Sequence, residues 1–168
     1  MKKPIPDGRV EEWLEELASE DGAQRQRARG ALVKLGPAII PHLAGHLEDN
    51  RERLRWEIAK TLEELGHPSA ATALVGLLMD DVPGIRWLAG EGLVRLKQEA
   101  LVPLLRGLQT NFHSTFFREG AHHVLRALER EGMLNEKSLD ALKALEGAAP
   151  SVSVPFAAAE ALHSLIES

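Results

Sequence analysis

The sequence predicts an all-α solenoid of helical hairpins stacked side by side, and the first observation behind this prediction is a repeat. Four arginines each stand ten residues before a leucine, and these leucines advance by 30, 31 and 32 residues. Self-similarity at such a period is typical of stacked supersecondary units rather than of one irregular core. The arginines are Arg25, Arg55, Arg86 and Arg118, and the leucines are Leu35, Leu65, Leu96 and Leu128.

The second observation is an apolar stripe that recurs in each copy. Counted back from the final leucine, apolar or small residues return at the eleventh, seventh, fourth and third positions, except that the first copy has Gln24 at the eleventh. At about 100° per residue these positions lie on one side of an α-helix, so each copy predicts a helix with one buried face. The second copy has Leu54, Ile58, Thr61, Leu62 and Leu65, and a degenerate last copy has Val154, Ala158, Ala161, Leu162 and Leu165.

The third observation is a second set of helices between these copies. Gly36-Pro37 and Gly66-His67-Pro68 mark the breaks, because glycine commonly ends a helix and proline is favoured in the first turn of the next. The second helices are expected at residues 37–48, 68–79, 99–108 and 136–145. Each repeat is therefore a helical hairpin, with longer connections expected near residues 110–115 and 147–155.

These patterns predict one domain over residues 1–168 with about five hairpins. An N-terminal capping helix is expected at about 9–20, where Val10, Trp13, Leu14 and Leu17 form an apolar stripe. The repeats are expected at about 21–49, 50–81, 82–110 and 111–147. A terminal partial repeat is expected at 150–168, where Pro155 replaces the repeated arginine.

Composition narrows the classes of function. The chain carries 20 basic and 25 acidic residues, and a net charge of -5 argues against non-specific attraction to nucleic acid or anionic lipid. Cysteine is absent, which excludes disulfides and thiolate metal sites and suits a reducing compartment. Prolines at Pro4 and Pro6 interrupt the start where a signal peptide needs an apolar run, and the longest apolar stretch, 70–79, is too short to span a bilayer. We therefore expect a cytoplasmic protein without a membrane segment.

One repeat carries a family resemblance. Residues 85–96 read IRWLAGEGLVRL after the segment DDVP at 80–83, and residues 54–66 form the same unit. This unit resembles the short HEAT repeat, also called the phycobilisome-lyase HEAT-like repeat, over about residues 21–165. The resemblance implies a right-handed α-α superhelix. It implies no single activity, because the family includes scaffolds, adaptors, lyase subunits, glycosylases and an iron hydroxylase.

The resemblance also implies a structural ladder. In the family, the aspartate before each unit and the arginine inside it bond across layers. By position, Asp49 belongs with Arg55, and Asp80 or Asp81 belongs with Arg86. The expected ladder consists of Arg25, Arg55, Arg86, Arg118, Asp49, Asp80 and Asp81.

Two tryptophans indicate a binding surface. Trp56 and Trp87 both stand nine residues before the final leucine, on the side of the helix opposite the buried stripe, and Phe156 holds this place in the last copy. The resemblance implies that this side lines a concave groove, where aromatic side chains commonly anchor an interface. The alternative is that the rings fold onto neighbouring helices and enlarge the core. The expected groove also carries Lys60, Glu91, Arg95, Glu119 and His123.

The sequence predicts no catalytic residue, metal or cofactor. His122 and His123 are adjacent on a helix, so their side chains point about 100° apart and do not share a metal. Only Glu119 stands four residues from His123, and no nucleophile elbow, phosphate loop or dinucleotide motif occurs. The iron hydroxylase that the family includes has His-Glu pairs where this chain has Arg-Trp.

The function expected first is a non-catalytic scaffold or adaptor that binds a protein or peptide on the concave side. The alternative is a HEAT-like enzyme or enzyme subunit, either a nucleic-acid binder similar to DNA glycosylases or a subunit similar to phycobilin lyases. Nucleic acid fits the mixed charges of the groove poorly. The chain is expected to be a monomer or a weak homodimer, with Trp87, Leu88, Phe112 and Phe116 as the candidate apolar patch.

Overall fold

The computed structural model describes residues 7–167, and these residues form the expected all-helical solenoid without a strand. The elements are α1 (Asp7–Leu17), α2 (Gly22–Leu35), η1 (Gly36–Ile39), α3 (Ile40–Ala44), α4 (Glu52–Leu65), η2 (Pro68–Ala70), α5 (Ala71–Leu77), α6 (Pro83–Leu96), η3 (Lys97–Ala100), α7 (Leu101–Asn111), α8 (Thr115–Arg130), α9 (Glu136–Glu146) and α10 (Pro150–Ile166).

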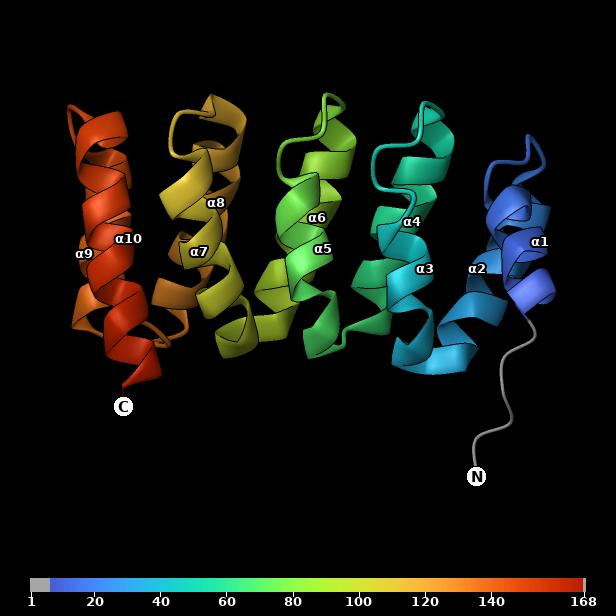
Figure 1. The fold of residues 1–168 in the computed structure, drawn as a ribbon, viewed down its shortest axis with the longest axis horizontal. Helices are drawn as coiled ribbons and strands as arrows, with labels where there is room; N and C mark the ends of the chain where they lie inside the picture. Colours follow the sequence, from blue (N-terminus) through green and yellow to red (C-terminus); the bar gives the residue numbers. More distant parts are fainter. Residues whose placement is uncertain (1–6, 168) are drawn as a thin grey trace.

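The helices stack in two layers (Figure 1). Helices α2, α4, α6 and α8 pack against one another in order, and we call them the arginine layer because they carry the repeated arginines. Helices α1, α3, α5 and α7 form the second layer in front of them (Figure 1). Each repeat thus adds one helix to each layer.

The predicted breaks between helices are confirmed, although the second helices start differently from the expectation. Gly66 ends α4 in the left-handed conformation, with φ 53°, and Pro68 opens the next element. Short 3-10 turns, η1, η2 and η3, lead into α3, α5 and α7. The hydrophobic pattern does not distinguish such a turn from the first turn of an α-helix.

The apolar stripe is buried as predicted. The residues seven and three positions before the final leucine are fully buried in each of the first four copies. Small residues let the layers approach closely: a Cβ added to Gly92 would lie 3.0 Å from the Leu74 side chain. The buried residues are Ala28, Leu32, Ile58, Leu62, Ala89, Leu93, Ala121 and Leu125.

The last hairpin reverses the order of its layers. Helix α9 packs on α8, and α10 packs on α7 and α9, so α10 lies in the second layer (Figure 1). The prediction that α10 continues the arginine layer is therefore wrong. Pro155 removes the arginine of the ladder, and the buried Val154, Ala158 and Ala161 present a narrow face that lets α10 lie close to its neighbours.

Both ends of the predicted domain are helical where the structure describes them. Helix α1 buries Val10, Leu14 and Leu17, as expected of the capping helix. The two longer connections that we expected are short: only residues 112–114 separate α7 from α8, and only 147–149 separate α9 from α10. The irregularity of the stack lies in the reversed hairpin and not in long loops.

Each repeated arginine anchors the loop before its own helix. The guanidinium donates from Nη1 to the main-chain carbonyl oxygen of the residue six positions earlier. These bonds run from Arg25 to Ser19 (2.8 Å), from Arg55 to Asp49 (2.8 Å), from Arg86 to Asp80 (2.7 Å) and from Arg118 to Phe112 (2.6 Å). The expected pairs Asp49 with Arg55 and Asp80 with Arg86 do form, but through main-chain oxygens.

The carboxylate partners of Arg25 and Arg55 stand 25 to 32 residues later in the chain. Arg55 donates to the Asp80 carboxylate at 2.8 and 3.1 Å and to Asp81 at 2.6 Å. Arg25 pairs instead with Glu57, at 3.0 Å. Arg55 therefore contacts both Asp49 and Asp80, because its guanidinium holds the loop before its own helix and extends across the layer toward the following loop.

The Arg55–Asp80 pair is shielded from water. The Asp80 side chain is only 3% exposed. Burial raises the pKa of the Asp80 carboxyl, but hydrogen bonds from Arg55 and from the Val82 N–H outweigh burial and hold that pKa below its ordinary value. Asp80 is therefore ionised when Arg55 binds it.

Candidate functional site

The outer face of the arginine layer carries seven of the eight residues expected in the groove. Phe156 is the exception, because α10 lies in the second layer, where this side chain is 73% exposed. Its placement beside the two tryptophans is therefore wrong. The other seven lie on three helices: Trp56 and Lys60 on α4, Trp87, Glu91 and Arg95 on α6, and Glu119 and His123 on α8.

Trp56 belongs largely to the packing between α4 and α6. Its indole is half-buried against the core, and Nε1 lies 3.8 Å from where a Cβ on Gly84 would stand. The Lys60 ammonium lies over the ring, 5.1 Å from the centroid. The core alternative therefore describes Trp56 better than an open anchor does.

Trp87, at the same position of the next repeat, is open to solvent. Its side chain is 61% exposed, and it lines a pocket of about 170 Å³ with Phe116, Glu119 and His123. The difference from Trp56 follows from the neighbouring repeat. The indole of Trp56 packs on Gly84, which has no side chain, whereas the equivalent residue beside Trp87 is Phe116, which has a large one. Phe116 is thus part of this surface.

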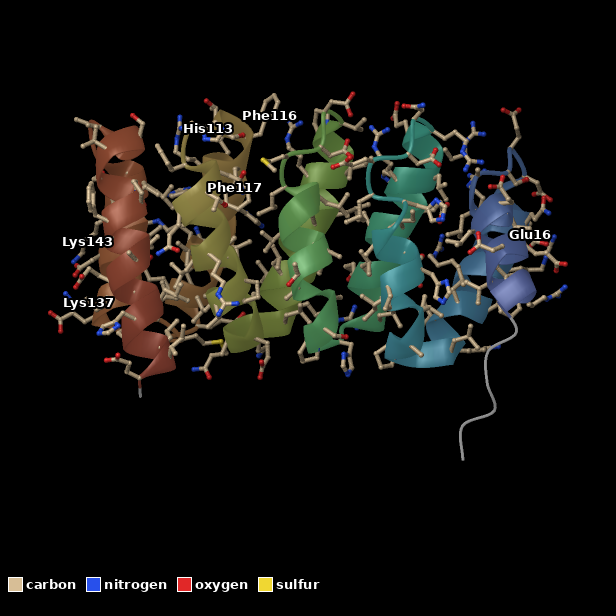
Figure 2. All side chains as sticks on the ribbon, in the orientation of Figure 1. Glu16, His113, Phe116, Phe117, Lys137 and Lys143 are labelled. Carbon is tan, nitrogen blue, oxygen red and sulfur yellow. The ribbon has the colours of Figure 1, made fainter. Side chains whose placement is uncertain are left out.

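The two adjacent phenylalanines of α8 lie differently (Figure 2). Phe117 is fully buried, whereas Phe116 is 46% exposed at the end of α8. The Arg86 guanidinium lies over the Phe116 ring, 4.0 Å from the centroid. The predicted dimer patch also included Leu88, which is only 6% exposed, so that part of the prediction is wrong.

Ion pairs link the helices across this face. His123 contacts Glu91 of α6 at 2.8 Å, and His122 contacts Glu146 of α9 at 2.9 Å. Arg95 pairs with Glu63 of α4 at 3.0 Å. The two histidines therefore connect α8 to both neighbours and do not converge on one point, which agrees with the 100° between them. Among residues 7–167, no group of three or more metal-ligating side chains gathers.

A buried ion cluster joins α2 to α4. Glu57 of α4 is 3% exposed and accepts hydrogen bonds from Arg25 and Arg29. Arg29 also pairs with Glu64 at 2.9 Å. Sequence reasoning missed this cluster because Arg29 stands outside the repeated pattern. A hollow of about 480 Å³ beside it is lined by Arg25, Glu52, Arg53, Trp56 and Glu57.

The loop edge of the layer has a larger hollow of about 520 Å³, lined by Asp49, Arg55, Asp80 and Asp81 among others. Its three aspartates are already engaged, Asp80 and Asp81 by Arg55. Arg51 donates to the Asp49 carboxylate at 2.9 Å, and this bond lowers the pKa of Asp49. These carboxylates hold the loops together and do not form a free acid-base pair.

Comparison with known protein families gives a match. The family described as HEAT repeats matches residues 10–93, which is half of the chain. No curated protein matches the chain significantly. Across the described part of the chain, every helix is too short or too polar to cross a bilayer.

Proposed function

Because the chain belongs to the HEAT repeat family, we propose that it is a non-catalytic scaffold or adaptor that binds a protein or peptide on the outer face of its arginine layer. One observation carries the proposal: Trp87 and Phe116 are 61% and 46% exposed side by side around a pocket of that face. Exposed aromatic side chains in a hollow are the usual anchors of an interface. The packed layers hold the surface in shape before a partner arrives, so little conformational entropy is lost on binding.

The charges on this face support a protein partner over nucleic acid. Basic and acidic side chains alternate there, and several are already paired, as in Arg95 with Glu63 and His123 with Glu91. A nucleic-acid track needs a continuous positive field. The absence of cysteine supports a cytoplasmic location, and the 30- to 32-residue period supports the short, phycobilisome-lyase-like type of repeat.

Replacing Trp87 by alanine tests this proposal. We expect the variant to lose binding while its thermal midpoint stays within a few degrees of the wild type, because the exposed indole contributes little to the core. The measurement is capture of partners on the immobilised chain, followed by binding curves with each captured protein.

Met79→Ala is the control, since it removes an exposed apolar side chain at the loop edge, outside both this pocket and α10. A partner that is retained by both variants, or lost by both, does not use the proposed surface. Trp56→Ala is a poor test by comparison, because the half-buried indole packs on the core and its loss lowers stability.

We also propose that copies associate weakly through the outer face of α10. Val152, Phe156 and Ile166 are 64%, 73% and 58% exposed and follow one side of the helix. A head-to-tail contact, in which α10 of one copy packs on α1 of another, is unfavourable. The outer side of α1 bears Glu11, Glu12 and other acidic residues, which would lose water against this apolar stripe. Contact between two α10 helices buries apolar surface on both sides, as a twofold interface requires.

Phe156→Glu should abolish this association, because it places a charge in the middle of the stripe. We expect the wild type to show a concentration-dependent increase in sedimentation coefficient and Phe156→Glu to sediment as a monomer. Trp87→Ala should associate as the wild type does. A monomeric wild type throughout the concentration range would contradict the dimer.

A further inference from the structure

The pocket between α6 and α8 is suited to a single side chain. Its volume of about 170 Å³ is below the range of about 300–1,000 Å³ that is common for small-molecule sites. Trp87, Phe116, Glu119 and His123 are among the residues that line it. A pocket of this size on an open face is a subsite for one residue of a longer partner.

This pocket is lined by one positive side chain, Arg86, and one carboxylate, Glu119, and of these two only Arg86 is already held by hydrogen bonds within the described residues. Arg86 donates to the carbonyl oxygens of Asp80 and Asp81, at 2.7 and 3.1 Å, and lies against Phe116. Glu91 accepts from His123 at 2.8 Å. Glu119 is exposed and has no hydrogen bond or ion pair with any residue in the range 7–167. The carboxylate that a partner meets there is Glu119.

Resting on the proposed function, we propose that this pocket binds an arginine side chain of the partner protein. The guanidinium stacks on the Trp87 indole and donates two parallel hydrogen bonds to the Glu119 carboxylate. The protein already places cations on aromatic rings nearby, with Lys60 over Trp56 and Arg86 over Phe116. In the proposed complex, Trp87 makes the same kind of cation–ring contact, and the partner protein supplies the cation.

Other side chains fit this chemistry less well. An acidic side chain is repelled by Glu119, and the Arg86 guanidinium that also lines the pocket is already held by two carbonyl oxygens and by the Phe116 ring. An aliphatic side chain gains contact with Trp87 but removes water from Glu119 without replacing its hydrogen bonds, which is unfavourable. Lysine supplies the charge, but not the planar group that stacks and donates two parallel bonds. Arginine satisfies the ring and the carboxylate together.

The test uses three capped pentapeptides, Gly-Gly-X-Gly-Gly, in which X is arginine, lysine or citrulline. Citrulline keeps the planar shape of arginine and lacks its charge. The chain has three tryptophans, so its ¹⁵N-labelled form has three indole N–H signals by NMR, and the signal that disappears in Trp87→Phe is that of Trp87. We expect the arginine peptide to move the Trp87 signal, to bind more tightly than lysine, and to bind about tenfold more tightly than citrulline.

Glu119→Gln should weaken binding of the arginine peptide by about tenfold and leave citrulline binding unchanged. Glu99→Gln is the matched control, because it removes the same charge from an exposed residue of η3. Equal binding of arginine and citrulline, equal losses in the two variants, or movement of another indole signal would each overturn the arginine assignment. If Trp87→Ala still loses a captured partner in that case, the proposed binding surface stands without it.

Discussion

Replacing Arg55 by alanine should lower the free energy of unfolding by about 3 kcal/mol, because it breaks a buried ion pair and leaves one charge behind. Arg55 is 9% exposed and donates to the Asp80 carboxylate at 2.8 and 3.1 Å. It also holds the Asp49 carbonyl at 2.8 Å. Without it, Asp80 keeps its burial and loses its counter-charge. The measurement is urea unfolding followed by circular dichroism.

Arg118→Ala is the matched control for this prediction. Arg118 makes the same carbonyl bond to its own loop, at 2.6 Å, but no carboxylate among residues 7–167 pairs with it. Its loss should destabilise by about 1 kcal/mol, the value of an ordinary hydrogen bond. Adding Asp80→Ala to Arg55→Ala should recover part of the loss, since it removes the unpaired charge. Equal effects of the two arginine substitutions would show that the buried carboxylate contributes nothing.

The same pair predicts how acid affects stability. The pKa of Asp80 is lowered in the folded chain from an ordinary 3.8, so the unfolded chain takes up a proton first as the pH falls. The contribution of Asp80 is complete above about pH 4 and declines as the pH falls through the lowered folded value. The stability difference between the wild type and Arg55→Ala should therefore narrow below about pH 4, in urea titrations at successive pH values.

Gly107→Ala should destabilise the chain by about 2 kcal/mol, although alanine is the better helix former. Gly107 lies inside α7, where an added Cβ would overlap Cζ of Phe117 and stand 2.9 Å from Val75 Cγ1. Both neighbours are buried, so neither moves without disturbing the core between the layers. The thermal midpoint and the urea midpoint should both fall.

Gly30→Ala is the opposite case within the same chain. Gly30 lies inside α2, and a Cβ added there meets no atom within 4 Å. We expect a gain of about 0.5 to 1 kcal/mol from helix propensity alone. Phe117→Leu in the Gly107→Ala background should restore part of the stability, because it shortens the side chain that the new methyl meets. A stabilising Gly107→Ala would show that the layers pack less tightly than these distances indicate.

The two tryptophans show what a repeat pattern leaves open. Trp56 and Trp87 hold the same position in their helices, yet one is half-buried and the other is 61% exposed. The reason lies in the next repeat. Gly84 leaves room for the indole of Trp56 to pack against α6, whereas the bulky Phe116 stands at the equivalent position beside Trp87. Aligning the repeats reveals this substitution in the sequence, but only the packed helices show its consequence.

Residue spacing is enough to predict the hairpin repeat, the buried face of each arginine-bearing helix and the position of the arginines, because these depend on positions within one helix. Packing between helices sets which carboxylate contacts Arg55, which tryptophan is exposed and in which layer α10 lies. Those outcomes depend on contacts between repeats: Asp80 is 25 residues from Arg55, and Glu91 is 32 residues from His123. A periodic pattern predicts which face of a helix is buried, but the residues that contact this face belong to the neighbouring repeat.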